Sequence, residues 1–129
     1  MNEKKAKPLA GRRLVDAIVS VAQDKLAEQI VVIDLREMAT TADFFIIGES
    51  ASTVHNRAIA QAIIDHCEEK GTIAWHNEGL NEGRWILIDY ADVVVHILLS
   101  DLRAFYLIET LWPPAKRTDV PPLHRYKED

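Results

Sequence analysis

Two apolar runs, at residues 85–88 and 93–98, are separated by only the four residues Asp89 to Asp92. Both runs are rich in isoleucine and valine, which favour extended structure. A link this short joins neighbouring antiparallel strands, because a crossover to a parallel strand needs a longer connection. The sequence therefore predicts a β-hairpin here, and the rest of the chain must supply further strands and a covering layer.

The remaining segments follow from their periodicity and their turn residues. Residues 30–33 and 44–47 are short apolar runs that predict strands, and a weaker run at 72–75 is joined to the hairpin by the polar loop 76–83. Apolar residues spaced by three and four predict a helix over 12–28 and a second one that begins after Ser50 or Ser52 and ends before Gly71. A third helix is expected over 101–111, because the two prolines that follow Trp112 cannot continue it.

These elements predict one α/β domain in the order α-β-β-α-β-β-β-α, with a mixed five-stranded sheet and flanking helices. We expect residues 1–10 to be a flexible N-terminal arm, 11–114 to form the domain, and 115–129 to be a flexible C-terminal tail. No apolar stretch is long enough to cross a membrane, and the single cysteine, Cys67, is typical of a reducing compartment. We therefore expect a cytoplasmic protein without a membrane partner.

Charge is distributed unevenly along the chain. Between Leu14 and Trp112 there are 16 acidic and 6 basic residues, a net charge of −10, whereas the two ends together are basic. An acidic body repels nucleic-acid backbones and favours basic protein surfaces, although an acidic surface also serves solubility alone. On charge, the chain is not expected to bind DNA directly.

Residues that would support catalysis are not arranged for it. Asp89 and Asp92 are three apart across a turn, where aspartate is common for its backbone hydrogen bonds, and a hard-cation site needs further oxygen ligands. The histidines show no metal-ligand spacing, and no phosphate-binding glycine loop is present in the sequence. We expect a protein that is not an enzyme and has no cofactor or metal.

An aromatic and acidic cluster is the most distinctive chemical feature. Trp75, Trp85 and Tyr90 lie within sixteen residues, among several carboxylates. Strand alternation places Trp85 on one face and Ile86 and Ile88 on the other, so the isoleucines should meet the helices. The aromatic residues are then either a protein-binding patch or part of a small core, and the pattern leaves both readings open. His96 is likewise either a buried strand residue or one that faces a partner.

The longest specific string in the chain is Trp85-Ile-Leu-Ile-Asp-Tyr-Ala-Asp-Val-Val-Val-His96, followed by Arg103-Ala-Phe-Tyr106 and by Leu111-Trp112. Upstream lie Ala42-Asp-Phe-Phe-Ile-Ile47 and Ser52-Thr-Val-His55. This collinear series, from Leu14 to Trp112, resembles the ribosomal silencing factor (Iojap) family. At position 91 many members have glycine and this chain has alanine, for which a positive φ at the turn is costly.

The resemblance implies a nucleotidyltransferase-like fold without the catalytic carboxylates. It also implies binding to ribosomal protein L-fourteen on the large ribosomal subunit, where the factor would block association with the small subunit and repress translation under nutrient limitation. A role in late large-subunit assembly and the formation of homodimers are implied as well. From the aromatic and acidic cluster, we expect the partner-binding residues to be Trp75, Glu78, Trp85, Asp89, Tyr90, Asp92 and His96.

Two rival functions stay open at this point. The first is a nucleotidyltransferase-like enzyme that uses Asp89 and Asp92 with a divalent metal. The second is an RNA-binding module in which basic residues near the N-terminus (Lys4, Lys5, Lys7, Arg12 and Arg13) dominate the affinity. Occlusion of the ribosome is favoured over both, because it needs affinity and bulk but no active site.

Overall fold

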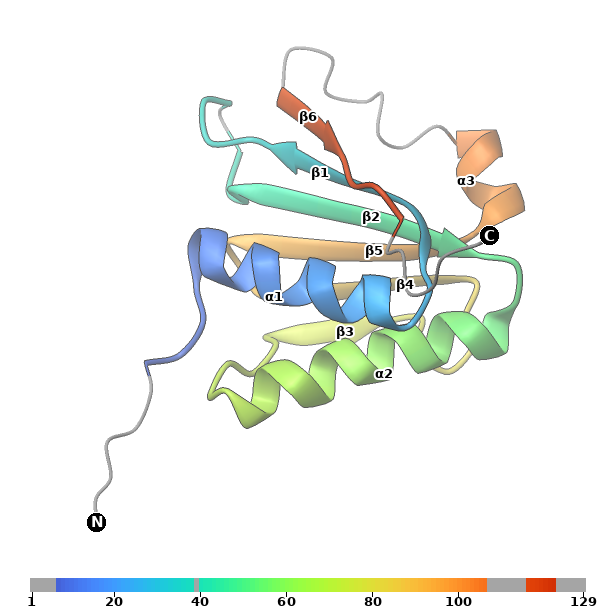
Figure 1. Cartoon of the computed structure of the whole chain (residues 1–129), viewed down its shortest axis with the longest axis horizontal. Helices are drawn as coiled ribbons and strands as arrows, with labels where there is room; N and C mark the ends of the chain where they lie inside the picture. The colour runs from blue at the N-terminus through green and yellow to red at the C-terminus, as the bar shows by residue number, and fades with distance from the viewer. Residues whose placement is uncertain (1–6, 39, 107–115, 123–129) are drawn as a thin grey trace, which may run out of the picture.

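The computed structural model describes residues 7–38, 40–106 and 116–122. One sheet runs through this part of the chain, with α1 and α2 side by side on one of its faces (Figure 1). The elements are α1 (Gly11–Asp24), β1 (Glu28–Asp34), β2 (Phe44–Ser50), α2 (Thr53–Glu69), β3 (His76–Glu78), β4 (Trp85–Asp89), β5 (Val93–Leu99), α3 (Ser100–Tyr106) and β6 (Lys116–Asp119). The strand order is β3-β4-β5-β2-β1-β6.

The mixed sheet has one parallel pair at its centre. β2 runs parallel to β5, and every other neighbouring pair is antiparallel. β4 and β5 form the hairpin predicted from residues 85–98, with Trp85 opposite Leu98 and Asp89 opposite Val94. The mixed α/β architecture is therefore confirmed.

The main core lies between the sheet and the two long helices. Ile86 and Ile88 are fully buried in it, which confirms that this side of β4 meets the helices. Aliphatic side chains from α1 and α2 close the other side; the largest are Leu14, Ile18, Ile59 and Ile63. Burial of this apolar surface is the main stabilising contribution to the domain.

The sheet has six strands, so the predicted five-stranded sheet is wrong. The additional strand, β6, lies in the segment 115–129 that was expected to be a flexible tail, and it pairs antiparallel with β1. All four β6 residues are exposed. The strand is therefore held by backbone hydrogen bonds to β1 and not by an apolar face, which is why no hydrophobic pattern marks it.

Three further boundaries differ from the predictions. The strand expected at 72–75 is displaced to His76–Glu78, an edge strand whose residues are all exposed. The helix expected to reach residue 28 ends at Asp24, where the chain turns through Leu26 at φ 64°. The third helix is described from Ser100 to Tyr106, and the rest of its predicted span, 107–111, lies outside the described residues.

Polar anchors fix α2 and α3 against the sheet. Ser52 caps α2 by accepting the backbone N–H of His55 at 3.0 Å, which selects between the two predicted caps. Asn56 is fully buried and donates to the Gly83 carbonyl over 2.8 Å. On α3, the buried guanidinium of Arg103 contacts Glu49 at 3.2 Å and donates to the Gln29 carbonyl.

No helix within the described ranges is long and apolar enough to cross a membrane.

The turn between β4 and β5 has a residue in the left-handed region at position 91, although this residue is alanine and not glycine. Ala91 has φ 76° and is exposed, and its N–H donates to the Asp89 carboxylate over 2.7 Å. An alanine at positive φ costs about 1 kcal/mol or more relative to glycine.

We expect Ala91→Gly to raise the free energy of unfolding by about 0.5–1 kcal/mol, because glycine adopts this φ without strain and the site leaves no packing to lose. Urea unfolding measured by circular dichroism tests this. Ala51→Gly is the matched control, since Ala51 is exposed and is not among the described positive-φ residues. Ala51→Gly should be neutral or slightly destabilising, and an equal gain in both variants would contradict the strain at Ala91.

Candidate protein-binding face

The face of the sheet opposite α1 and α2, here called the open face, carries a second apolar cluster. Its buried members are aliphatic side chains of β1, β2 and β5 with the residues that follow β1: Val31, Ile33, Leu35, Ala42, Ile47 and Leu98. Leu102 of α3 packs against one end of this cluster. Over β4 and β5, Trp85 and Val94 are only partly buried. The sequence prediction that the Trp85 face is partly open is therefore confirmed.

A shallow depression of about 390 Å³ lies on the open face. Its floor is apolar, and includes Phe45, Leu87 and Val94. Its remaining lining comes from β3, the end of β4 and the loop between β1 and β2: Thr40, Thr41, His76, Glu78 and Asp89, with Leu35, Ala42 and His96. An apolar hollow bordered by polar and acidic groups is typical of a surface that receives a side chain of a partner.

His96 lies on β5 opposite Leu87, and only 6% of its surface is exposed. The indole N–H of Trp85 donates to its Nδ1 over 3.1 Å, and the Phe45 ring packs 5.0 Å from its centroid. Because Nδ1 accepts this bond, the proton of the neutral ring is on Nε2. Trp85 thus fixes both the tautomer and the orientation of the imidazole.

The Nε2–H of His96 is buried and has no hydrogen-bond partner among the described residues. Burial lowers the pKa of His96 to about 4, so the ring is neutral near pH 7. His96 as a residue lines the depression, while its Nε2 is itself buried.

Acidic groups border the depression on the β3 side. His76 lies between Glu78, with 3.2 Å from its Nε2 to the carboxylate, and Asp89, with 3.8 Å from its Nδ1. The Glu78 side chain is 69% exposed. Trp75, immediately before β3, is 78% exposed, the largest value among the exposed large apolar residues of the described chain. This edge of the sheet therefore carries negative charge, and an accessible aromatic residue precedes its edge strand.

The structure brings three of the seven predicted site residues, Glu78, Asp89 and His96, to the depression, and the Trp85 indole reaches it through its hydrogen bond to His96. The backbone N–H of Trp75 donates to the Asp89 carbonyl, but the Trp75 ring is not part of the lining. Tyr90 does not belong with them, because it packs in the helix-side core with only 6% exposed. Burial and the neighbouring Cys67 thiol raise the pKa of Tyr90 well above its usual value. Its assignment to a surface patch is therefore wrong.

Asp92 is also directed elsewhere. Its carboxylate accepts the N–H of Gly11 at the start of α1 over 3.0 Å, whereas the Asp89 carboxylate accepts from Ala91 and lies near His76. The two carboxylates therefore bind different elements and do not converge, which removes the geometric basis of the rival metal-dependent site. Among the described residues, no group of three or more His, Cys, Asp or Glu is placed to hold a metal ion.

Sequence reasoning missed Phe45, Leu87 and Val94, which form the apolar floor. Strand alternation carried the information, because Leu87 shares a face with Trp85, and Val94 with His96. Phe45 was not identifiable in this way, since its place beside His96 depends on the parallel pairing of β2 with β5.

Comparison with known proteins gives consistent results. Residues 8–129 match the family model described as "Ribosomal silencing factor during starvation". The chain is 35% identical over 109 residues to "Ribosomal silencing factor RsfS" of Bacillus subtilis (strain 168), an alignment that covers 84% of this chain and 92% of that protein. It is 28% identical over 101 residues to "Mitochondrial assembly of ribosomal large subunit protein 1" of Mus musculus, covering 76% and 44% respectively.

A solved structure supports the same relationship. A crystal structure of a protein from Bacillus halodurans superposes with a TM-score of 0.73 at 36% identity, covering 82% of this chain and 98% of that one. Most of the described fold is therefore shared with a protein of similar sequence.

We expect acidification to destabilise the domain through His96. Its folded-state pKa is about 4, below the unfolded value of 6.5, so the unfolded chain binds more protons between these pH values. Stability contributed by the neutral ring is present above pH 6.5 and is lost as the pH falls toward 4. Between pH 7 and pH 4.5 the loss should be about 2 kcal/mol.

Urea unfolding at both pH values measures this loss. His96→Phe should remove most of it, because phenylalanine is not protonated and fits the apolar surroundings. His66→Gln, a change at a partly exposed histidine of α2, is the control and should keep the full pH dependence. The same loss in wild type and His96→Phe would show that other groups carry it.

Proposed function

The chain belongs to the ribosomal silencing factor family, and we propose that it binds the large ribosomal subunit through the open face and blocks association with the small subunit. The partner that we propose is ribosomal protein L-fourteen, as the family resemblance implies. By preventing subunit joining in the cytoplasm, the protein would repress translation under nutrient limitation. A contribution to late large-subunit assembly is also proposed, in line with the printed name of the mouse relative.

The observation that carries this proposal is the depression beside Trp85 and His96. A neutral imidazole N–H without a partner in the described structure, an apolar floor and an acidic border together fit a protein surface with three features. These are an oxygen acceptor for His96, an apolar side chain for the hollow, and a lysine or arginine for Glu78. The net charge of −10 between residues 14 and 112 favours such a basic partner over a long range.

Occlusion also fits the chemistry of the site better than catalysis does. A steric block requires bulk and affinity, and it needs no paired carboxylates and no bound metal. Asp89 and Asp92, the pair on which an enzyme mechanism would depend, are held apart by their separate hydrogen bonds. We therefore propose a non-catalytic mechanism. Formation of homodimers stays a prediction.

We expect Trp75→Ala combined with Glu78→Lys to weaken binding to large subunits at least tenfold. Both side chains are largely exposed, so their loss should leave the unfolding free energy nearly unchanged. Sedimentation of the purified protein with isolated large subunits, small subunits and joined ribosomes measures binding and subunit joining together. Val54→Ala is the control, because it also truncates an apolar residue that is 67% exposed but lies on α2.

Wild type and Val54→Ala should bind the large subunit alone and reduce the yield of joined ribosomes. If wild type binds no particle, or binds small subunits equally well, the proposed function is wrong. If the double variant binds as wild type does, the protein acts through a surface other than this edge of the open face.

A further inference from the structure

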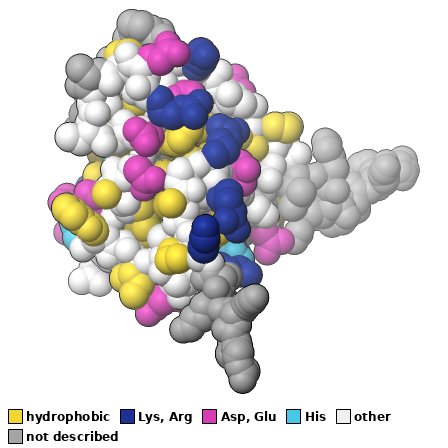
Figure 2. Space-filling view, turned by 90° about the vertical axis from the view of Figure 1, so that its left-hand side faces the viewer, with side chains coloured by type: hydrophobic (Ala, Val, Ile, Leu, Met, Phe, Trp, Pro, Cys, Tyr) yellow, Lys and Arg dark blue, Asp and Glu magenta, His cyan; other side chains and the backbone are white. Residues whose placement is uncertain are grey.

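One end of this acidic domain carries a row of cations, here called the basic ridge. Its centre is Arg12 and Arg36, which lie over one aromatic ring, and we group with them the exposed basic residues of the adjoining segments: Lys7, Arg13 and Lys70. Figure 2 shows dark-blue Lys and Arg side chains gathered in a column along this end of the molecule, with some carboxylates beside them. Lys7, Arg12 and Arg13 were already candidates for RNA contact in the sequence, whereas Arg36 and Lys70 come from the loop after β1 and the end of α2 and are added by the fold.

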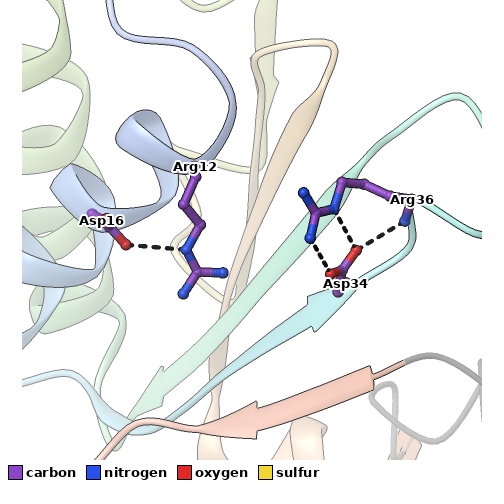
Figure 3. A network of polar contacts seen from close by, with 4 residues as sticks. All are labelled: Arg12, Asp16, Asp34 and Arg36. Atoms are coloured by element: carbon purple, nitrogen blue, oxygen red, sulfur yellow. Dashed lines mark hydrogen bonds and ion pairs between the residues drawn. The ribbon is translucent and has the colours of Figure 1, made fainter.

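Two arginines of the ridge are held over the same aromatic ring. The guanidinium carbon of Arg12 lies 5.7 Å from the centroid of Phe44, and that of Arg36 lies 5.0 Å from it. Asp16 fixes Arg12 at 3.4 Å, and Asp34 binds Arg36 through two side-chain contacts of 3.0 and 2.8 Å (Figure 3). The packing fixes the two planar cations in place before any ligand arrives.

Each guanidinium keeps donors available for a ligand. The ion pair of Arg12 uses its Nε, and those of Arg36 use Nε and one Nη; the remaining terminal nitrogens have no hydrogen-bond partner among the described residues. In Figure 3 the terminal nitrogens of Arg12 point away from Asp16. A planar guanidinium with free N–H groups matches the oxygens of a phosphate.

The lower part of the ridge is joined by the N-terminal segment. Thr72 donates its hydroxyl to the Leu9 carbonyl over 2.9 Å. Gly71 lies beside Pro8, so that a side chain at position 71 would come within 3.9 Å of the Pro8 Cα. This contact places the segment that carries Lys7 beside the C-terminal end of α2, which carries Lys70. The ridge is therefore built by tertiary contacts and is not a chance effect of basic composition.

We propose that the basic ridge binds the phosphodiester backbone of RNA. The contacts that hold the two central arginines are ion pairs and cation–π contacts, whereas a protein interface normally has an apolar centre. Several cations along one end of the domain, two of them planar guanidinium groups, are suited to a polyanion of regular spacing.

The ridge borders the open face, because Arg36 lies in the same β1–β2 loop as Thr40 and Thr41, which line the depression. This placement deepens the proposed function and rests on it for its biological setting. A ribosomal surface presents protein and RNA side by side, so the open face would bind the protein while the ridge binds neighbouring phosphates. The acidic remainder of the domain would keep RNA away from other surfaces.

The test uses the full chain and a fluorescein-labelled RNA duplex of about 20 base pairs, followed by anisotropy at several salt concentrations. Wild type should bind with a dissociation constant of about 10⁻⁴ to 10⁻⁵ M, and affinity should fall about fiftyfold between 50 and 200 mM salt if about three phosphates are contacted. Arg12→Glu combined with Arg36→Glu should lower the affinity at least tenfold at 50 mM salt and flatten the salt dependence.

The matched control is Lys25→Glu combined with Arg84→Glu, which makes the same change in net charge at exposed positions away from the ridge. It should bind RNA nearly as wild type does, and urea unfolding should show that both double variants are folded. Absence of RNA binding by wild type at 50 mM salt would overturn the proposal. So would an equal loss in ridge and control variants, or stronger binding to phosphatidylglycerol vesicles than to RNA under the same conditions.

The Trp75→Ala, Glu78→Lys variant separates this proposal from the proposed function. It should bind the RNA duplex at least as well as wild type does while losing large-subunit binding. If wild type binds the duplex through the ridge but does not sediment with ribosomal particles, only the proposed function fails. If it sediments with large subunits but shows no affinity for the duplex, only the ridge proposal fails.

Discussion

Asp92 connects the β4–β5 turn to the start of β2 and to the start of α1, and the arrangement of the sheet and first helix depends on these contacts. Its backbone carbonyl accepts the N–H groups of Asp43 and Phe44, where β2 begins, and its carboxylate accepts the N–H of Gly11, where α1 begins. One residue of the β4–β5 turn therefore fixes the register of the central parallel pair and the start of the first helix. Because Phe44 is held there, Arg12 and Arg36 meet over its ring. A residue that looked like part of a binding surface is instead a structural junction.

Both long helices pack on one face of the sheet, so neither of them covers the open face. The open face keeps a buried histidine whose Nε2–H finds no acceptor in the described structure. Trp85 keeps the imidazole in a single orientation and tautomer. The arrangement favours a partner with an acceptor at this position over one that is merely basic.

The sequence was informative wherever an apolar pattern caused the structure. The hairpin at 85–98 and the inward face of Ile86 and Ile88 were predictable, because burial on one side imposes a period of two. The apolar pattern did not predict the elements and burial that are determined by backbone pairing or by polar contacts. β6 has no apolar face, and α2 buries Asn56 while leaving Val54 exposed, because Asn56 has hydrogen-bond partners in Ser50 and Gly83. Tyr90 was misplaced because a turn residue does not follow strand alternation.

Net charge was a poor guide to the surface for a related reason. The sum of −10 between residues 14 and 112 is a property of the chain, whereas binding depends on which charges the fold brings together. Tertiary contacts separate the signs: Glu78 and Asp89 border the depression, while Arg12 and Arg36 meet over Phe44 at one end of the sheet. The loop between β1 and β2 contributes to both regions, with Arg36 in one and Thr40 in the other. A partner that combined a basic protein surface with neighbouring phosphates would therefore meet two complementary surfaces on one rigid domain, and its orientation would be fixed by both.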